Sequence, residues 1–275
     1  MTEFYRTNYL SEKRGESRHV VLHYHIFKNA GTSVDAILKN CFGDSFMSVD
    51  GPVPEFFINQ TEVNVMIRNR AQVKALSSHQ IRLPVPRDRL IDYLPIVFIR
   101  RPELRIQSMW RFQRSRNDEH PATRLAKQLD FAEWIEFHLE KKKSSPIFNQ
   151  QAVLFSFQYD ERTPGNHPEV LGRALANIES LEFVGIVEQF SDSMKIYQRL
   201  YGPKVPEFAF ESTPRLNRSA EDDSAVDQQI EKIEVSLGAD LFSALSDRMH
   251  LDIELYERCR ASFEDHAREL RDDES

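Results

Sequence analysis

The architecture of this chain follows from residues 19–42, which read HVVLHYHIFKNAGTSVDAILKNCF. The first part, 19–27, is apolar and rich in β-branched and aromatic residues, so it predicts a buried strand. From Val34 to Cys41 the apolar residues recur at the spacing of one helical face, which predicts a helix over 33–42. A tight turn is therefore expected to join a strand to a helix.

The turn carries groups that suit an anionic ligand. Lys28 supplies a positive charge, and Gly31 allows a ligand to approach the backbone closely. Thr32 and Ser33 add hydroxyl donors at the start of the helix, where free backbone N–H groups and the helix dipole attract phosphate. The turn therefore predicts a phosphate-binding site; taken alone, it also fits an ordinary turn with a surface lysine.

A second element with similar chemistry lies further along the chain. Residues 95–100 are apolar and predict another buried strand, which ends at Arg100. Arg100 thus stands at the carboxyl end of a strand, where open α/β sheets bind ligands. Pro102 suits the first position of the helix expected over 103–116, and Ser108 lies about two turns later. A guanidinium and a hydroxyl suit a second phosphate, although singly they also fit a salt bridge and an ordinary helix position.

These two elements, in this order, resemble the nucleotide-binding elements of sulfotransferases that use 3'-phosphoadenosine 5'-phosphosulfate (PAPS). The turn is similar to the family's phosphosulfate-binding loop, although Phe27 stands where the family often has proline. Arg100 and Ser108 are similar to the pair that holds the 3'-phosphate. The likeness covers about residues 19–264 and looks closest to the branch of the uronyl 2-O-sulfotransferases and their bacterial relatives. Three later segments also resemble the family: 174–190, 214–219 and 252–257.

The resemblance implies which residues bind PAPS. They belong to the turn, to the second strand end with its helix, and to a late loop that closes over the nucleotide. These cofactor-binding residues are Lys28, Asn29, Ala30, Gly31, Thr32, Ser33, Arg100, Ser108 and Arg218. Lys28 is also expected to act in catalysis by neutralising charge on the leaving phosphate. The acceptor that the resemblance implies is a hydroxyl group on a carbohydrate.

A histidine is expected to be the catalytic base, because its side chain titrates near neutral pH. His79 ends a predicted strand over 73–79 and matches the family's base, which follows a glycine or another small residue. His23 and His25 lie on one face of the first strand, where at least one is expected to be packed or hydrogen-bonded. His79 is therefore the predicted base, with His25 as the alternative. Because no cluster of histidine, cysteine and acid shows metal-ligand spacing, no metal is predicted.

Charge and composition narrow the class of protein. The chain has 275 residues and a net charge of −7, which argues against a nucleic-acid-binding protein. Residues 68–116 nevertheless hold twelve Lys or Arg and three acids, a local positive field that suits an anionic cofactor. No apolar run approaches the ~20 residues that span a bilayer, and residues 1–15 are polar, so a cytoplasmic protein is predicted. Cys41 and Cys259 form no disulfide framework.

Helices that alternate with short apolar strands predict an α/β protein. We expect a P-loop-like layered fold with a mainly parallel central sheet flanked by helices. A single domain is expected over 1–275, with flexible ends at about 1–17 and 268–275. The expected helices are 33–42, 103–116, 122–142, 168–180, 191–201, 224–237 and 247–270. The expected strands are 19–27, 73–79, 95–100 and 183–187.

The predicted function is transfer of a sulfuryl group from PAPS to an acceptor hydroxyl. A P-loop-type kinase or other nucleotide phosphotransferase is one alternative, but Lys28 precedes the glycine and no clear Walker B acid follows. A nucleotide-binding protein that has lost catalysis is the other alternative. The presence of His79, Lys28 and Arg100 together argues against it.

Overall fold

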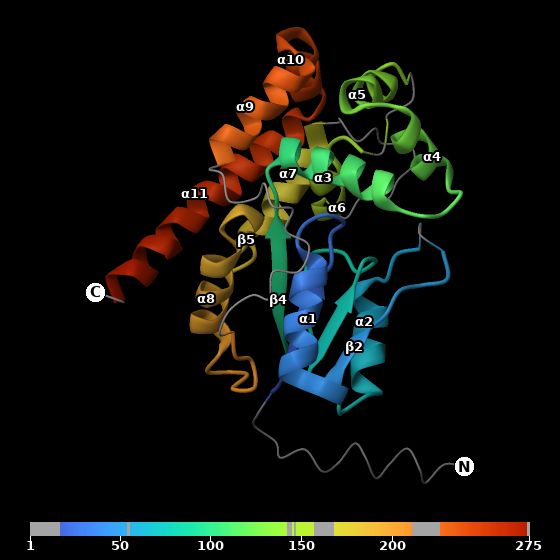
Figure 1. Cartoon of the computed structure of the whole chain (residues 1–275). Coiled ribbons are helices and arrows are strands. Elements are labelled where there is room, and N and C mark those ends of the chain that lie inside the picture. The colour runs from blue at the N-terminus through green and yellow to red at the C-terminus, as the bar shows by residue number, and fades with distance from the viewer. Residues whose placement is uncertain are drawn as a thin grey trace.

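The fold is built on a parallel sheet (Figure 1). The structure, a computed structural model, describes residues 17–53, 56–141, 145, 147–156, 168–210 and 226–273. Within them, five strands pair in the order β2-β3-β1-β4-β5, and every pair is parallel. The strands are β1 (Arg18–Tyr24), β2 (Phe46–Ser48), β3 (Ala75–Ser78), β4 (Ile91–Ile99) and β5 (Gly185–Ile186).

The strand order favours a ligand site at the end of β1. The chain leaves β1 toward β2 and β3 on one side, then returns past it to β4 on the other side. Open α/β sheets bind ligands at such a reversal, outside the carboxyl ends of the strands. The turn that follows β1 therefore lies where the fold itself favours a binding site.

The central strands are buried, and helices pack against the sheet. All residues of β3 and most residues of β1 and β4 are buried, as is typical of parallel strands that are covered on both faces. Helix α1 (Gly31–Phe42) contacts β1, β2 and β3, whereas α8 (Phe190–Tyr201) and α11 (His250–Asp273) contact β5. The expected α/β fold, with a mainly parallel sheet flanked by helices, is confirmed.

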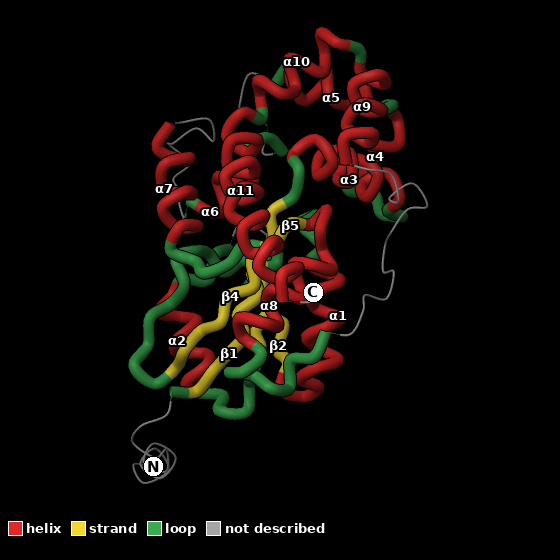
Figure 2. Tube along the Cα trace, turned by 90° about the vertical axis from the view of Figure 1, so that its left-hand side faces the viewer, coloured by secondary structure: helices red, strands yellow, loops and turns green. Residues whose placement is uncertain are grey.

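A group of helices lies beyond the carboxyl ends of the strands, at the top of Figures 1 and 2. We call this group the cap. It has its own hydrophobic cluster, separate from the cluster around the sheet, and buries Ile106, Trp134 and Leu245. Phe27, in the turn after β1, packs against the cap cluster, so the predicted phosphate site lies where sheet and cap meet. The cap consists of α3 (Pro102–Ser115), α4 (Pro121–Gln128), α5 (Phe131–Leu139), α9 (Val226–Leu237) and α10 (Ala239–Arg248).

One expected helix is two helices. The segment 122–142 is divided into α4 and α5 because Asp130 and Glu133 form a capping box that starts a new helix. The Asp130 carboxylate accepts the Glu133 amide at 3.0 Å, and the Glu133 carboxylate accepts the Asp130 amide at 2.9 Å.

Several elements of the structure were not expected from the sequence. These are α2 (Gln60–Arg68), α6 (Gln150–Phe155), α10 and strand β2, whereas α7 (Pro168–Glu179) was expected. The strand expected over 183–187 pairs only at Gly185–Ile186, just before the short helix η2 (Val187–Gln189). Helix α11 continues to Asp273, into the segment expected to be a flexible end, and the short helix η1 (Gly43–Ser45) follows α1. None of the described helices is long and apolar enough to cross a membrane.

Candidate active site

The turn between β1 and α1 has a strained backbone. Lys28 and Ala30 have φ angles of 68° and 61°. This left-handed conformation costs a residue with a side chain about 1–3 kcal/mol, and such strain clusters at functional sites. The amides of Ser33 and Val34 donate to the carbonyl oxygen of Ala30, whereas the first amides of a helix have no carbonyl one turn behind them. The earlier amides of α1 are therefore the groups that an anion would contact.

The ammonium group of Lys28 lies between the turn and the cap. Its Nζ is 4.5 Å from the ring centroid of Phe112 on α3 and 5.7 Å from that of Phe27, so both rings attract the charge. Burial, and secondly the charge of Arg100, lower the pKa of Lys28. Ser108 lies four residues before Phe112 and shares its helix face. Lys28 is therefore directed toward the side of α3 that carries Ser108.

Arg100 follows β4 and contacts the same turn. Its Nη1 donates to the carbonyl oxygen of Lys28 at 3.2 Å, and its Nε lies 3.8 Å from a carboxylate oxygen of Glu188. The sheet edge thus brings together two cationic side chains that are far apart in sequence. We call residues 28–33, Arg100 and Ser108 the lysine side of the site.

The side chain of Asn29 supports the turn, so its assignment as a cofactor-binding residue stays a prediction that concerns its backbone. Its side chain is buried and donates to the carbonyl oxygen of Phe98 at 2.8 Å and to Gln151 at 2.7 Å. Its backbone amide donates to Ile26 at 3.1 Å. Gln151 also bonds both backbone groups of Arg100, at 2.9 Å each. Sequence reasoning missed Gln151, which joins the turn to Arg100.

A buried ion pair holds Gln151 in place. Asp252, in one of the late segments that resemble sulfotransferases, accepts the backbone amide of Ala152 at 2.8 Å at the start of α6. Its other carboxylate oxygen lies 3.9 Å from Nη2 of Arg105, and both side chains are fully buried. Arg105 and Asp252 therefore position α6, on which Gln151 lies, and do not line the site.

His79 directly follows β3, at the same edge of the sheet as the turn. Its Nδ1 lies 2.8 Å from the carbonyl oxygen of His25. Because a carbonyl only accepts, Nδ1 carries the proton and Nε2 of the neutral ring keeps a lone pair. Asp50 accepts the backbone amide of His79 at 2.8 Å and the hydroxyl of Ser78 at 3.0 Å. Partial burial, and secondly the neighbouring His25, lower the pKa of His79, which favours the proton-accepting form.

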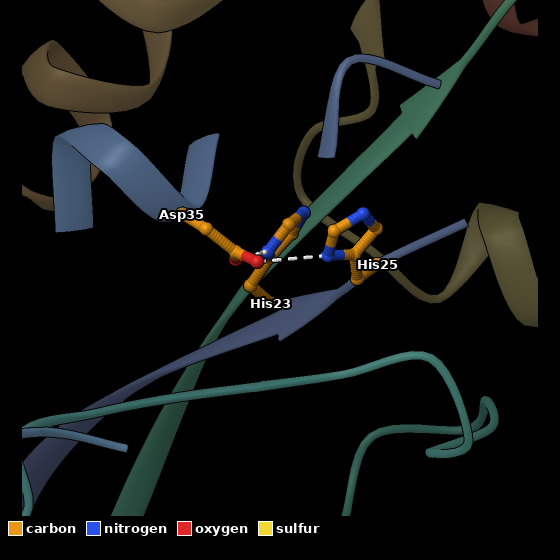
Figure 3. Close-up of side chains that lie close together, drawn as sticks. All are labelled: His23, His25 and Asp35. Atoms are coloured by element: carbon orange, nitrogen blue, oxygen red, sulfur yellow. Dashed lines mark hydrogen bonds and ion pairs between the residues drawn. The ribbon is translucent and has the colours of Figure 1, made fainter. Parts of the chain in front are cut away.

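Three side chains form a hydrogen-bonded group (Figure 3). One of them, His25, is in ring contact with His79. The carboxylate of Asp35, on α1, accepts from Nδ1 of His23 and from Nδ1 of His25, each at 2.8 Å. Ser77 lies 2.9 Å from the same nitrogen of His23. Burial lowers the pKa of His23 to about 4, so His23 is a neutral, buried strand histidine. We call His23, His25, Asp35 and His79 the histidine side of the site.

The group in Figure 3 is also of the residue types that bind metal ions. His23, His25 and Asp35 offer ligand atoms that lie within 4.8 Å of one another. Metal-ligand spacing along the sequence did not indicate this cluster, because Asp35 comes from α1, His23 from β1 and His25 from the residue after β1. Since both Nδ1 atoms already bond the carboxylate, the geometry is that of a hydrogen-bonded group.

Gly31 is the point where the two sides of the site touch. A Cβ atom at Gly31 would lie 2.0 Å from Cδ2 of His25, so only glycine allows the ring to pack against the start of α1. The ring of His25 also contacts the ring of His79, and the two ring centroids are 3.8 Å apart. The histidine side is therefore in contact with the turn through His25.

Comparison with known proteins shows the family of this chain. The model of the sulfotransferase family matches residues 14–257. The chain belongs to the sulfotransferase family. It is also 30% identical over 250 residues to an uncharacterized protein of Archaeoglobus fulgidus, an alignment that covers 88% of this chain and 96% of that protein.

For this sulfotransferase, one predicted site residue lies outside the described part of the chain. Arg218 and the segment 214–219 fall within residues 211–225, which the structure does not describe. Sequence reasoning also missed Asp35. One sequence feature could have indicated it: Asp35 is an acidic residue on a predicted helix that directly follows a predicted strand with two histidines on one face.

Proposed function

We propose that this sulfotransferase transfers a sulfuryl group from PAPS to an acceptor hydroxyl, with His79 as the base. The observation that carries the proposal is the meeting of Lys28, Arg100 and the start of α1 at one sheet edge. A strained, anion-accepting turn and two cations suit a ligand with several phosphate-type groups. His79 lies at the same edge and is joined to the turn through His25.

Each group of the site has a distinct task in this proposal. PAPS, when bound, supplies the sulfuryl group. The first amides of α1 hold the phosphosulfate, with the hydroxyls of Thr32 and Ser33 nearby. Lys28 stabilises the charge that develops on the leaving phosphate. Arg100 and Ser108 hold the 3'-phosphate, and Arg218 belongs to the loop proposed to close over the nucleotide.

His79 handles the proton. Its Nε2 takes the proton of the acceptor hydroxyl as the acceptor oxygen forms a bond to sulfur. The bond from sulfur to the phosphate oxygen breaks, and adenosine 3',5'-bisphosphate leaves. The proton then passes from His79 to solvent, so the chain returns to its starting state.

The acceptor that we propose is a carbohydrate, from the resemblance to the uronyl 2-O-sulfotransferases and their bacterial relatives. The basic segment 68–116 supports an anionic donor and also suits an anionic acceptor, since a positive field raises the local concentration of both. Arg82 lies in this segment, with its Nη1 2.7 Å from the carbonyl oxygen of His79.

A thermal-shift comparison of nucleotides tests the proposal. Adenosine 3',5'-bisphosphate should stabilise the chain well beyond ADP or AMP, because a ligand that binds only the native state raises its stability. Arg100→Ala should remove most of the preference for the 3'-phosphate. Arg173→Ala, an exposed arginine that pairs with Glu169 on α7, is the matched control and should keep it. Equal shifts with ATP, or a requirement for magnesium, would favour the phosphotransferase alternative.

A further inference from the structure

The ammonium group of Lys28 has aromatic rings as neighbours, where a carboxylate is the usual partner of a lysine. Its Nζ is 4.5 Å from the ring centroid of Phe112 and 5.7 Å from that of Phe27. Among the residues that the structure describes, no carboxylate forms an ion pair with Lys28. The rings attract the positive charge without neutralising it, so the full charge is kept for an anionic ligand.

The two rings also contact each other and join the turn to the cap. Their centroids are 5.4 Å apart and their planes are 75° apart, which is the favourable edge-to-face arrangement of aromatic pairs. Phe112 belongs to α3, and Phe27 packs against the cap cluster. A proline at position 27, as the family often has, would supply no such ring.

The side chain of Lys28 needs support at this place. Its stem of four carbons has many rotamers, so holding it in one of them costs conformational entropy. Arg100, which bonds the carbonyl oxygen of Lys28 at 3.2 Å, brings a like charge to the same sheet edge. Both effects favour a lysine that turns away into solvent. Rings that hold the ammonium group beforehand reduce the cost of placing it beside a ligand.

We infer that Phe112 and Phe27 are positioning residues that hold the ammonium group of Lys28 where the leaving phosphate forms. The inference rests on the proposed function, because it takes Lys28 as the group that stabilises that phosphate. Phe112 is the principal support, since its ring is the closer one. Arg116 lies 5.7 Å from the same ring centroid, but Asp118 accepts from its Nε at 2.6 Å and balances its charge.

The cap contains a matched pair of lysine and phenylalanine that is not part of the site. Nζ of Lys141 is 4.6 Å from the ring centroid of Phe137, which lies on α5. Phe137 is 38% exposed and Phe112 is 36% exposed, so loss of either ring should affect the stability of the cap to a similar degree. Phe137→Leu is therefore the control for Phe112→Leu.

Nuclear magnetic resonance of the full chain with ¹³C-labelled lysine tests the contacts without nucleotide. An aromatic ring displaces the signals of atoms above its face upfield. The ε protons of Lys28 and Lys141 should therefore both lie upfield of those of Lys39, an exposed lysine. In Phe112→Leu, the signal of Lys28 should move most of the way to that of Lys39, and Lys141 should not change. Phe137→Leu should move Lys141 and leave Lys28 unchanged, and Lys28→Arg and Lys141→Arg assign the two signals.

An assay of sulfuryl transfer distinguishes positioning from a merely structural role. In Phe112→Leu, kcat should fall by about threefold to tenfold, the range of one cation–π contact. KM for PAPS and the affinity for adenosine 3',5'-bisphosphate should stay within about twofold of wild type, because the charge matters most as the leaving phosphate forms. Phe112→Tyr keeps an aromatic ring and should retain kcat, and Phe27→Leu should lose less than Phe112→Leu. In a Lys28→Ala background, Phe112→Leu should cause no further loss, because Phe112 acts through Lys28.

Three results would overturn the inference. The first is a wild-type signal of Lys28 at the position of Lys39, a measurement that does not depend on the folding of any variant. The second is a kcat of Phe112→Leu equal to that of wild type. The third is an equal loss of kcat in Phe137→Leu, which would show that the stability of the cap is responsible. The lysine signals need no nucleotide, so their failure is distinct from a failure of the bisphosphate thermal shift, which tests the proposed function.

Discussion

The lysine side and the histidine side of the site are built in different ways. Most of the lysine side comes from residues 28–33, six successive residues that form the end of the turn and the start of α1, and only Arg100 and Ser108 come from elsewhere. The histidine side takes His23 from β1, His25 from the residue after β1, Asp35 from α1 and His79 from the residue after β3. An anion can be bound by the backbone of a single turn, whereas control of a proton needs side chains from several elements in contact.

The two sides also differ in what supports them. Asn29 and Gln151 hold the turn and the backbone of Arg100, and they do so through buried amide hydrogen bonds. A carboxylate and a glycine support the histidine side instead, since Asp35 orients both strand histidines and Gly31 leaves room for His25. Variants of each side should therefore fail in different measurements.

Loss of the base should give the largest effect. In His79→Ala, the rate of sulfuryl transfer should fall by about 10²–10⁴, because no group then accepts the acceptor's proton. The thermal shift with adenosine 3',5'-bisphosphate should stay close to wild type, since that ligand is held by the lysine side. His250→Ala, an exposed histidine on α11, is the matched control. A rate close to wild type in His79→Ala would move the role of base to His25.

Loss of the lysine should come next. In Lys28→Ala, turnover should fall by about 10²–10³, because the charge matters most as the leaving phosphate forms. Affinity for the bisphosphate product should fall much less. Lys39→Ala, an exposed lysine at the end of the same helix, should change neither measurement. If turnover in Lys28→Ala equals wild type, the turn is an ordinary turn with a surface lysine.

Acid should destabilise sheet and cap alike, through one buried histidine in each. Burial lowers the pKa of His23, in β1, and of His138, in the cap, from 6.5 to about 4. As the pH falls from 6.5 toward 4, the unfolded chain takes up protons that the folded chain does not, so stability is lost. Each histidine should lower the free energy of unfolding by about 1.4 kcal/mol per pH unit. Urea unfolding at several pH values checks this, and His23→Gln and His138→Gln should each reduce the slope; unchanged slopes in both would refute it.

A methyl group at the junction of the two sides should have the smallest effect. In Gly31→Ala, the ring of His25 must move, at a cost of about 1–3 kcal/mol in the free energy of unfolding. The contact of His25 with His79 should also loosen, which the titration midpoint of His79 would report. Gly172→Ala, where a Cβ meets nothing within 4 Å on α7, is the control and should be neutral or slightly stabilising. A fully stable Gly31→Ala variant with an unshifted His79 would show that the packing is loose.

The fold class and the family could be predicted because their signals are local. Apolar runs mark the strands, and helical spacing marks α1, α3 and α8, so the α/β fold is confirmed. The boundaries were less predictable where side chains compete with periodicity. The apolar pattern of 122–142 continues across Asp130, and only the capping box with Glu133 divides it. The roles of Lys28, Arg100 and His79 stay predictions.

The sequence by itself determined the turn, because a lysine, a glycine and two hydroxyl residues between a strand and a helix are contiguous and their chemistry does not depend on distant residues. Only the tertiary structure decided that Asn29 faces inward, that Gln151 joins the turn to Arg100, and that Asp35 bonds both strand histidines. These contacts depend on the pairing of β1 with β3 and β4, on the packing of α1 against the sheet and on the packing of α6 against α7 and α11. A hydrogen bond between two elements forms only when donor and acceptor lie about 3 Å apart. Tertiary packing fixes such distances, whereas the spacing of residues along the chain does not.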